Sequence, residues 1–346
     1  MPPFHDSTRL LKTLTPLITT VDSHTEGEIT RLILDGTGNI PGASMMEKLA
    51  FFKSHCDHLR CRVTREPRGS REVLAAAVTE PVSPEASFGL IYMDAKRYPY
   101  LCGHATMGAV VTLARTGFLE LGPGENRVLI DTPSGTMETR AHVEKGEVMS
   151  VELDMVPSFV FDTQREIRVE GFGKVKVDLV CTGGFFAMVD TAPLGLEPVL
   201  ENREILVDLG MKIIAAANEQ LEVWHPARPE VNTVDVTEFY DVDPGSGPQS
   251  GRGMVAYGES HMDRSPCGTG TAAKLALLHH YGKIGMDEPY VNSSPLGTRF
   301  EARLKKKTKI GNMDAVTVRI KGRAWVTGIH HFTMDRTDPF QQGYMI

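Results

Sequence analysis

Two cysteines stand in similar local sequences, each a Cys-Gly pair before an apolar segment, and could exchange protons with a substrate. Cys102 lies in the segment LCGHAT at 101–106, and Cys267 lies in SPCGTGT at 265–271, so a glycine follows each. Small and apolar residues then predict a helix in both places, ending near Gly117 and Gly282. The free N–H groups at a helix N-terminus favour anions, so they can bind a carboxylate and lower the pKa of a thiol.

A pair of such thiols predicts stereoinversion at an acidic carbon. One thiolate would take an α-proton, and a thiol on the opposite face would return one. Without an electron-withdrawing cofactor, backbone donors in a closed cavity must stabilise the carbanion. Gly103, His104, Gly268 and Thr269 are placed to supply donors. Asp263, four residues before Cys267, could accept a hydrogen bond from a substrate ammonium.

Two plainer interpretations apply to either cysteine alone. A single cysteine in an apolar helix is most often a small core residue. A nucleophilic Cys-His enzyme, with His104 or His261 as the base, would leave the other cysteine without a role. The repeated Cys-Gly-helix pattern favours the paired role.

The cysteine segments also suggest how the chain is organised. They are 165 residues apart (267 − 102), nearly half of the 346 residues, which predicts two similar α/β halves with a boundary near residue 150. Helices are predicted at 43–61 and 203–219. Strands are predicted at 31–34, 72–79, 87–93, 127–131, 136–144, 149–154, 167–170, 175–180, 312–320 and 322–329, and a surface loop at 241–248.

Composition narrows the function classes. The formal net charge of −7 argues against a nucleic-acid-binding protein. No segment has about 20 consecutive apolar residues, so no membrane span is expected. The N-terminus lacks the apolar core of a secretory signal, and five cysteines make a poor disulfide framework, so a cytoplasmic location is expected. His55, Cys56, Asp57, His58 and Cys61 lack the spacing of a zinc site, and no metal is expected.

The motifs resemble the proline racemase family, which also contains 4-hydroxyproline 2-epimerases and trans-3-hydroxyproline dehydratases. The resemblance covers about residues 18 to 344. It is carried by DSHTEGE at 22–28 with Thr30 and Arg31, which resembles the family's opening strand, by EPRG at 66–69, LCGH at 101–104, DRSPCGTG at 263–270, LGTRF at 296–300, GRAWVTG at 322–328 and DPF at 338–340. Ala105 and Glu26 depart from the family's usual residues, but neither removes a catalytic group.

The resemblance implies an α/β (α+β) fold of two pseudo-symmetric halves, each a curved mixed sheet around a central helix, as in diaminopimelate epimerase-like proteins. One half would be residues 1–150, completed by about 320–346, the other would be 151–320, and the site would lie between them. The resemblance further implies a homodimer without a cofactor, acting on a small-molecule substrate. Its acid/base thiols would be Cys102 and Cys267, with substrate contacts from Gly103, His104, Asp263, Gly268 and Thr269.

The choice within the family rests on two residues. The dehydratases carry threonine at the second cysteine position, so Cys267 favours a racemase or epimerase. Tyr257 followed by Gly258 resembles the proline racemases, whereas the epimerases tend to have a smaller residue followed by proline. The Tyr257 ring could pack against an unsubstituted pyrrolidine, but its hydroxyl could instead bond to a 4-hydroxyl. Proline is favoured, and 4-hydroxyproline stays open.

Overall fold

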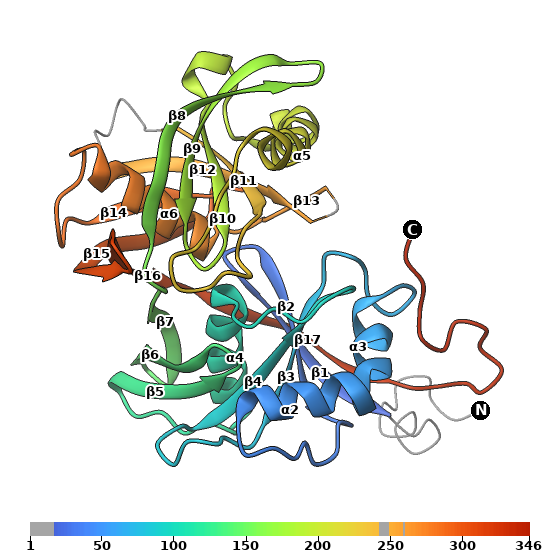
Figure 1. Ribbon diagram of the computed structural model, residues 1–346. Helices are drawn as coiled ribbons and strands as arrows, with labels where there is room; N and C mark the ends of the chain where they lie inside the picture. The colour runs from blue at the N-terminus through green and yellow to red at the C-terminus, as the bar shows by residue number, and fades with distance from the viewer. Residues whose placement is uncertain (1–16, 242–248, 259) are drawn as a thin grey trace. The chain divides into compact units, whose positions relative to one another are not determined.

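The computed structural model describes residues 17–241, 249–258 and 260–346, and the predicted loop at 241–248 lies almost entirely outside the described residues (Figure 1). The chain divides into two compact units. The first comprises the described residues of Met1–Thr25, with Ile29–Met149 and Ala324–Ile346. The second comprises Glu26–Glu28 and the described residues of Ser150–Arg323. The cysteines are therefore in different units, Cys102 in the first and Cys267 in the second.

The first unit is a mixed sheet with helices on both faces. Its strands run in the order β17–β1–β2–β3–β4–β5–β6, parallel at β2–β3 and β4–β5 and antiparallel elsewhere. The elements are β1 (Ile18–Thr25), β2 (Glu28–Asp35), α2 (Met45–Phe51), the π-helix η1 (Phe52–Cys56), α3 (Asp57–Thr64), β3 (Leu74–Thr79), β4 (Phe88–Met93), α4 (Gly103–Arg115), β5 (Gly124–Thr132), β6 (Gly135–Glu144) and β17 (Ala324–Phe332), and β7 (Glu147–Asp154) leads into the second unit.

Alternate residues of the central strands face opposite helices, as the strand period of two requires. On one face, Ile91 packs with Phe52 and the other apolar residues of α2, η1 and α3. On the other face, Tyr92 bonds to Thr106 of α4, with 2.6 Å between the hydroxyl oxygens. Gly108 lets α4 approach the sheet closely, because a Cβ there would lie 2.9 Å from Ser23 Oγ. These contacts fix the helix that begins after Cys102.

The second unit wraps its strands around α6. Strand pairing follows β8–β9–β10–β11–β12–β14–β15–β16, and a bridge between Ser158 and Val316 joins β16 to the start of β8. The elements are β8 (Phe159–Val169), β9 (Gly173–Cys181), β10 (Phe185–Asp190), η2 (Ala192–Leu194), η3 (Leu200–Asn202), α5 (Arg203–Gln220), β11 (Val234–Tyr240), β12 (Ser250–Tyr257), β13 (His261–Met262), α6 (Gly268–His280), β14 (Tyr290–Ser293), β15 (Arg299–Ile310) and β16 (Met313–Gly322).

The two helices of this unit lie on opposite faces of β11. Phe239 packs with Leu209 and Ile213 of α5, whereas the neighbouring Glu238 points toward α6. Every residue of α6 from Gly270 to Leu278 is buried, as expected of a helix that is apolar on all sides. The one charged member of this buried stretch is Lys274.

The structure confirms the predicted fold class, since curved mixed sheets surround a central helix in a mixed α/β fold. The strand predicted at 31–34 lies within β2, and the segment 22–31, which resembles the family's opening strand, contains parts of two strands, β1 and β2. Strands β1 and β2 form a hairpin there, turning at Glu26 (φ 47°) and Gly27 (φ 106°), the positive values that a tight hairpin turn needs. None of the predicted strand ranges covers β10, β11, β12, β13, β14 or β15. Within the described ranges, no helix is both long and apolar enough to cross a membrane.

Candidate active site

Cys102 is the N-cap residue of α4 and has an extended backbone (φ −149°, ψ 113°). Its carbonyl accepts the first intrahelical bond, from Thr106 N at 3.0 Å, so the N–H groups of Gly103 and His104 precede the helical ladder. The Cys102 Sγ lies 3.2 Å from His104 Nδ1, close enough for a hydrogen bond. Thr25 Oγ1 donates to the His104 carbonyl at 2.8 Å, which holds this turn against β1.

Cys267 is the N-cap residue of α6 and repeats this arrangement with more strain. Its carbonyl accepts from Thr271 N at 2.8 Å, and its Sγ accepts from Gly270 N at 3.4 Å and lies 3.4 Å from Thr269 Oγ1. Its φ of 55° is rare for a residue with a side chain and costs about 1–3 kcal/mol. Ser265 Oγ fixes this conformation by accepting from Cys267 N at 3.1 Å. Such strain persists where the surroundings impose it, as they do at reactive sites.

The electrostatic surroundings of Cys267 differ from the expectation for a helix N-terminus. Burial raises the pKa of its thiol well above the ordinary value, and the negative charges of Asp263 and Glu238 raise this pKa further. The hydrogen bonds from Thr269 and Gly270 oppose this shift but do not reverse it. The predicted lowering of the thiol pKa is therefore wrong for Cys267, which is a protonated thiol at neutral pH.

The predicted substrate contacts of the second unit gather around the same segment. Asp263 is buried, and its Oδ1 accepts from both the N–H and the hydroxyl of Ser265 at 2.8 Å. Ser265 thus links the Asp263 carboxylate to the cysteine segment, because its Oγ also accepts from Cys267 N. Tyr257 ends β12, and its ring meets His261 edge-on at a centroid distance of 4.7 Å. Gly268 and Thr269 are the first two residues of α6.

Two glycines at this helix start have different structural reasons. A Cβ at Gly270 would lie 2.5 Å from Glu238 Oε2, so packing requires glycine there. A Cβ at Gly268 would meet only ordinary contacts, the nearest being Met155 Cε at 3.5 Å. Packing by the described residues therefore does not explain the glycine at 268, the position expected to approach a ligand.

Glu28 is a site residue that the sequence analysis did not identify. It belongs to the second unit, is almost fully buried, and accepts from Arg264 N at 2.7 Å and from Arg264 Nη1 at 3.4 Å. His261 Nε2 lies 3.3 Å from its Oε1. A carboxylate beside the hairpin turn thus anchors the segment that leads to Asp263 and Cys267. The only sequence signal was an acidic residue directly after the Glu26-Gly27 turn.

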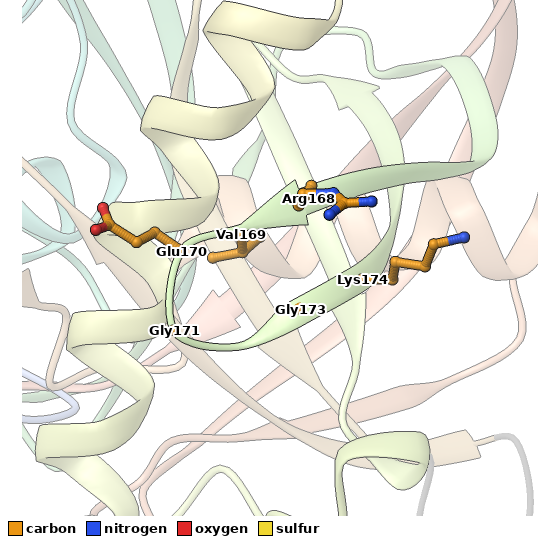
Figure 2. Close-up of a pocket in the computed structure, with 6 residues that line it drawn as sticks. All are labelled: Arg168, Val169, Glu170, Gly171, Gly173 and Lys174. Atoms are coloured by element: carbon orange, nitrogen blue, oxygen red, sulfur yellow. The ribbon is translucent and has the colours of Figure 1, made fainter.

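Other candidate positions lie elsewhere. Cys56, Cys61 and Cys181 are buried free thiols whose pKa values burial raises. Across the described parts of the chain, no three His, Cys, Asp or Glu side chains gather as metal ligands would. Figure 2 shows a surface pocket at the β8–β9 hairpin, which holds none of the predicted site residues and is lined by Arg168, Val169, Glu170, Gly171, Gly173 and Lys174.

Known proteins match this chain over nearly its whole length. The family model described as "Proline racemase" matches residues 20–345. The proline racemase of Clostridioides difficile is 37% identical over 95% of this chain and 98% of its own. The 4-hydroxyproline 2-epimerase of Streptosporangium roseum is 37% identical over 94% of this chain and 97% of its own. A crystal structure of a hydroxyproline epimerase from Agrobacterium vitis with bound trans-4-OH-L-proline is 29% identical, has a TM-score of 0.86 and covers 96% of each chain. Racemases and epimerases such as these relatives are isomerases.

Proposed function

The chain belongs to the proline racemase family, and we propose that it is an isomerase that inverts the α-carbon of proline or of a hydroxyproline, with proline favoured. Cys102 and Cys267 are the two acid/base thiols in this proposal, and no cofactor takes part. The single observation that carries the proposal is that both cysteines occupy the same place, the N-cap of a 13-residue buried helix.

In the proposed reaction, each cysteine serves one face of the substrate α-carbon. The substrate carboxylate accepts hydrogen bonds from the N–H groups of Gly103, His104, Gly268 and Thr269, which lie ahead of the helical ladders. These donors stabilise the negative charge that develops when the α-proton leaves. Asp263 accepts from the substrate ammonium. Inversion follows when the second thiol protonates the carbanion on the face opposite to the one that lost its proton.

The protonated state of Cys267 sets the first direction of proton flow. A buried thiol beside two carboxylates holds its proton, so Cys267 acts first as the acid. Cys102 then acts as the base, and His104 Nδ1, 3.2 Å from Cys102 Sγ, can donate a hydrogen bond to its thiolate. Turnover of one enantiomer leaves the proton on Cys102, the state that accepts the other enantiomer.

Tyr257 supports proline as the favoured substrate. Its ring is half-buried at the end of β12 and offers an apolar surface to an unsubstituted pyrrolidine. The alternative, 4-hydroxyproline 2-epimerase, rests on the Tyr257 hydroxyl, which could bond to a 4-hydroxyl. Dehydration of trans-3-hydroxy-L-proline is less favoured, because elimination of water needs only one base and gives the second thiol no role. We also expect a homodimer in the cytoplasm.

Incubation in D₂O with L-proline or trans-4-hydroxy-L-proline tests the proposal. Loss of the α-proton signal by NMR, with a change in optical rotation, is expected for one of these substrates or both. Cys102→Ala and Cys267→Ala should each lower the inversion rate by about 10²–10⁴-fold. Cys181→Ala is the matched control, since it removes a buried thiol of β9 that has no proposed role. Retained inversion in both site variants would refute the two-thiol mechanism.

A further inference from the structure

Glu238 and Lys274 form a fully buried pair directly beneath the first turn of α6. Glu238 lies in β11 and Lys274 in α6, and both side chains are completely inaccessible to solvent. Glycines at two positions leave space for the Glu238 carboxylate. A Cβ at Gly270 would lie 2.5 Å from Glu238 Oε2, and a Cβ at Gly253 would lie 2.7 Å from Glu238 Oε1. Gly270 is also the residue whose N–H binds Cys267 Sγ. The carboxylate therefore lies against the backbone that holds the thiol.

The Glu238 carboxylate is poorly satisfied where it lies. Neither oxygen accepts a hydrogen bond from any described residue. Its nearest cation, Lys274 Nζ, is 3.9 Å from Oε1 and donates instead to the Arg252 carbonyl at 2.7 Å and to Asn292 Oδ1 at 2.8 Å. A buried carboxylate without hydrogen bonds is costly, and an apolar pair of similar volume often replaces such an ion pair without loss of stability. This cost points to a role other than stability.

Titratable groups of several elements surround the thiol and this pair. Asp263 precedes α6, Tyr240 ends β11 and Asp241 follows it, and Tyr290 begins β14. The two tyrosine rings lie 5.7 and 6.0 Å from Lys274 Nζ. Burial raises the pKa of Glu238 to about 7, Lys274 lowers it and Asp263 raises it, whereas burial lowers the pKa of Lys274. Glu238 is therefore charged throughout the higher pH range in which Cys267 loses its proton.

We propose that Glu238 is a positioning residue that keeps the proton on Cys267. The negative carboxylate opposes formation of the thiolate above it. Asp263 also accepts a hydrogen bond from the substrate ammonium in the proposed reaction, and the positive charge of the ammonium would offset the negative charge of Asp263. Glu238 has no such partner in the proposed reaction and would still oppose the thiolate when substrate is bound. The inference rests on the proposed function, in which Cys267 begins as the acid.

Glu238→Gln tests this role because it keeps the shape of the side chain and removes the charge. The readout is the ¹³Cβ NMR shift of Cys267 as a function of pH in cysteine-labelled protein, with its signal assigned by loss in Cys267→Ser. We expect the titration midpoint to fall by about one pH unit in Glu238→Gln. Glu238→Asp, which retains the charge, should keep a midpoint close to that of the parent protein.

Asp178→Asn is the matched control, since it neutralises another buried carboxylate of the second unit. The Asp178 Oδ1 accepts hydrogen bonds from Gln164 N and from the Tyr281 hydroxyl. Its Cys267 midpoint should not move. If Glu238→Gln does not fold, Glu238→Gln with Lys274→Met leaves the core uncharged and should show the same fall. An unchanged midpoint in a folded Glu238→Gln or double variant overturns the inference. The titration needs no substrate, so absence of racemisation would refute the proposed function without deciding the role of Glu238.

Discussion

Gly268 and Gly270 are two residues apart in the first turn of α6, and alanine at each should have opposite consequences. A methyl group at 270 would lie 2.5 Å from Glu238 Oε2 and 3.0 Å from Val255 Cγ2, and both atoms are buried. A methyl group at 268 would lie 3.5 Å from Met155 Cε and 3.8 Å from Ile320 Cδ1, which are ordinary contact distances. Gly270→Ala therefore tests packing, and Gly268→Ala tests how closely a substrate approaches the backbone.

The expected magnitudes follow from these contacts. Alanine gains up to about 1 kcal/mol over glycine through its helix propensity, so Gly268→Ala should unfold at the same or slightly higher urea concentration. Overpacking a close-packed core costs about 1–3 kcal/mol, and displacing the Glu238 carboxylate adds to this cost. Gly270→Ala should therefore be less stable than Gly268→Ala by about 2 kcal/mol or more.

Gly268→Ala, the variant expected to be fully stable, should nevertheless lose catalytic activity. If its N–H binds the substrate carboxylate, a methyl group beside that N–H should lower kcat/KM for proline by about tenfold or more in a fully folded protein. Urea unfolding followed by circular dichroism, and α-proton exchange in D₂O, measure the two effects. Equal stability of the two variants would contradict the packing argument, and normal kinetics of Gly268→Ala would contradict the carboxylate site.

Three other perturbations test separate parts of the structure. Tyr257→Phe should leave kcat/KM for proline within about threefold of the parent value, and a loss of about tenfold or more with 4-hydroxyproline alone would favour the epimerase alternative. Glu28→Gln removes the negative charge of the carboxylate that accepts a hydrogen bond from Arg264 N. Urea titration should show a loss of about 1.5–3 kcal/mol in the free energy of unfolding. Hydrogen bonds from Arg60 and Tyr98 lower the pKa of Asp57 from 3.8 to about 2, so its stabilisation is present above about pH 4 and is lost as the pH falls through 2. Asp57→Asn should therefore be less stable than the parent above pH 4, and thermal unfolding should show this difference shrinking toward pH 2.

The helices that carry the cysteines were predictable because their sequences are unusual. A Cys-Gly pair followed by small apolar residues on all sides predicts a buried helix, and the structure has α4 at Gly103–Arg115 and α6 at Gly268–His280. Strand β10 was missed because nearly all its residues are buried, and a short apolar run has no period that distinguishes strand from helix. The hairpin of β1 and β2 was missed because Glu26 is not a usual residue for a positive φ.

The electrostatics of the site could not be predicted in the same way. Glu238 stands in the alternating segment VDVTEFY, where the sequence does not say which face meets α6. Lys274 gave a signal, a lysine within an otherwise apolar helix, but its partner is 36 residues away (274 − 238). Glu28 is 236 residues from Arg264. Pairings at such distances along the chain depend on tertiary structure, which local patterns do not encode.

Two similar Cys-Gly motifs therefore have different charge surroundings. At Cys102, a ring nitrogen of His104 lies 3.2 Å from the sulfur and can donate a hydrogen bond to a thiolate. At Cys267, burial and two carboxylates favour the thiol. A two-thiol reaction needs this inequality, because two thiolates have no proton to give and two thiols have no base to take one. The shared motif accounts for the type of chemistry, whereas the side chains packed against each helix decide which cysteine begins as acid.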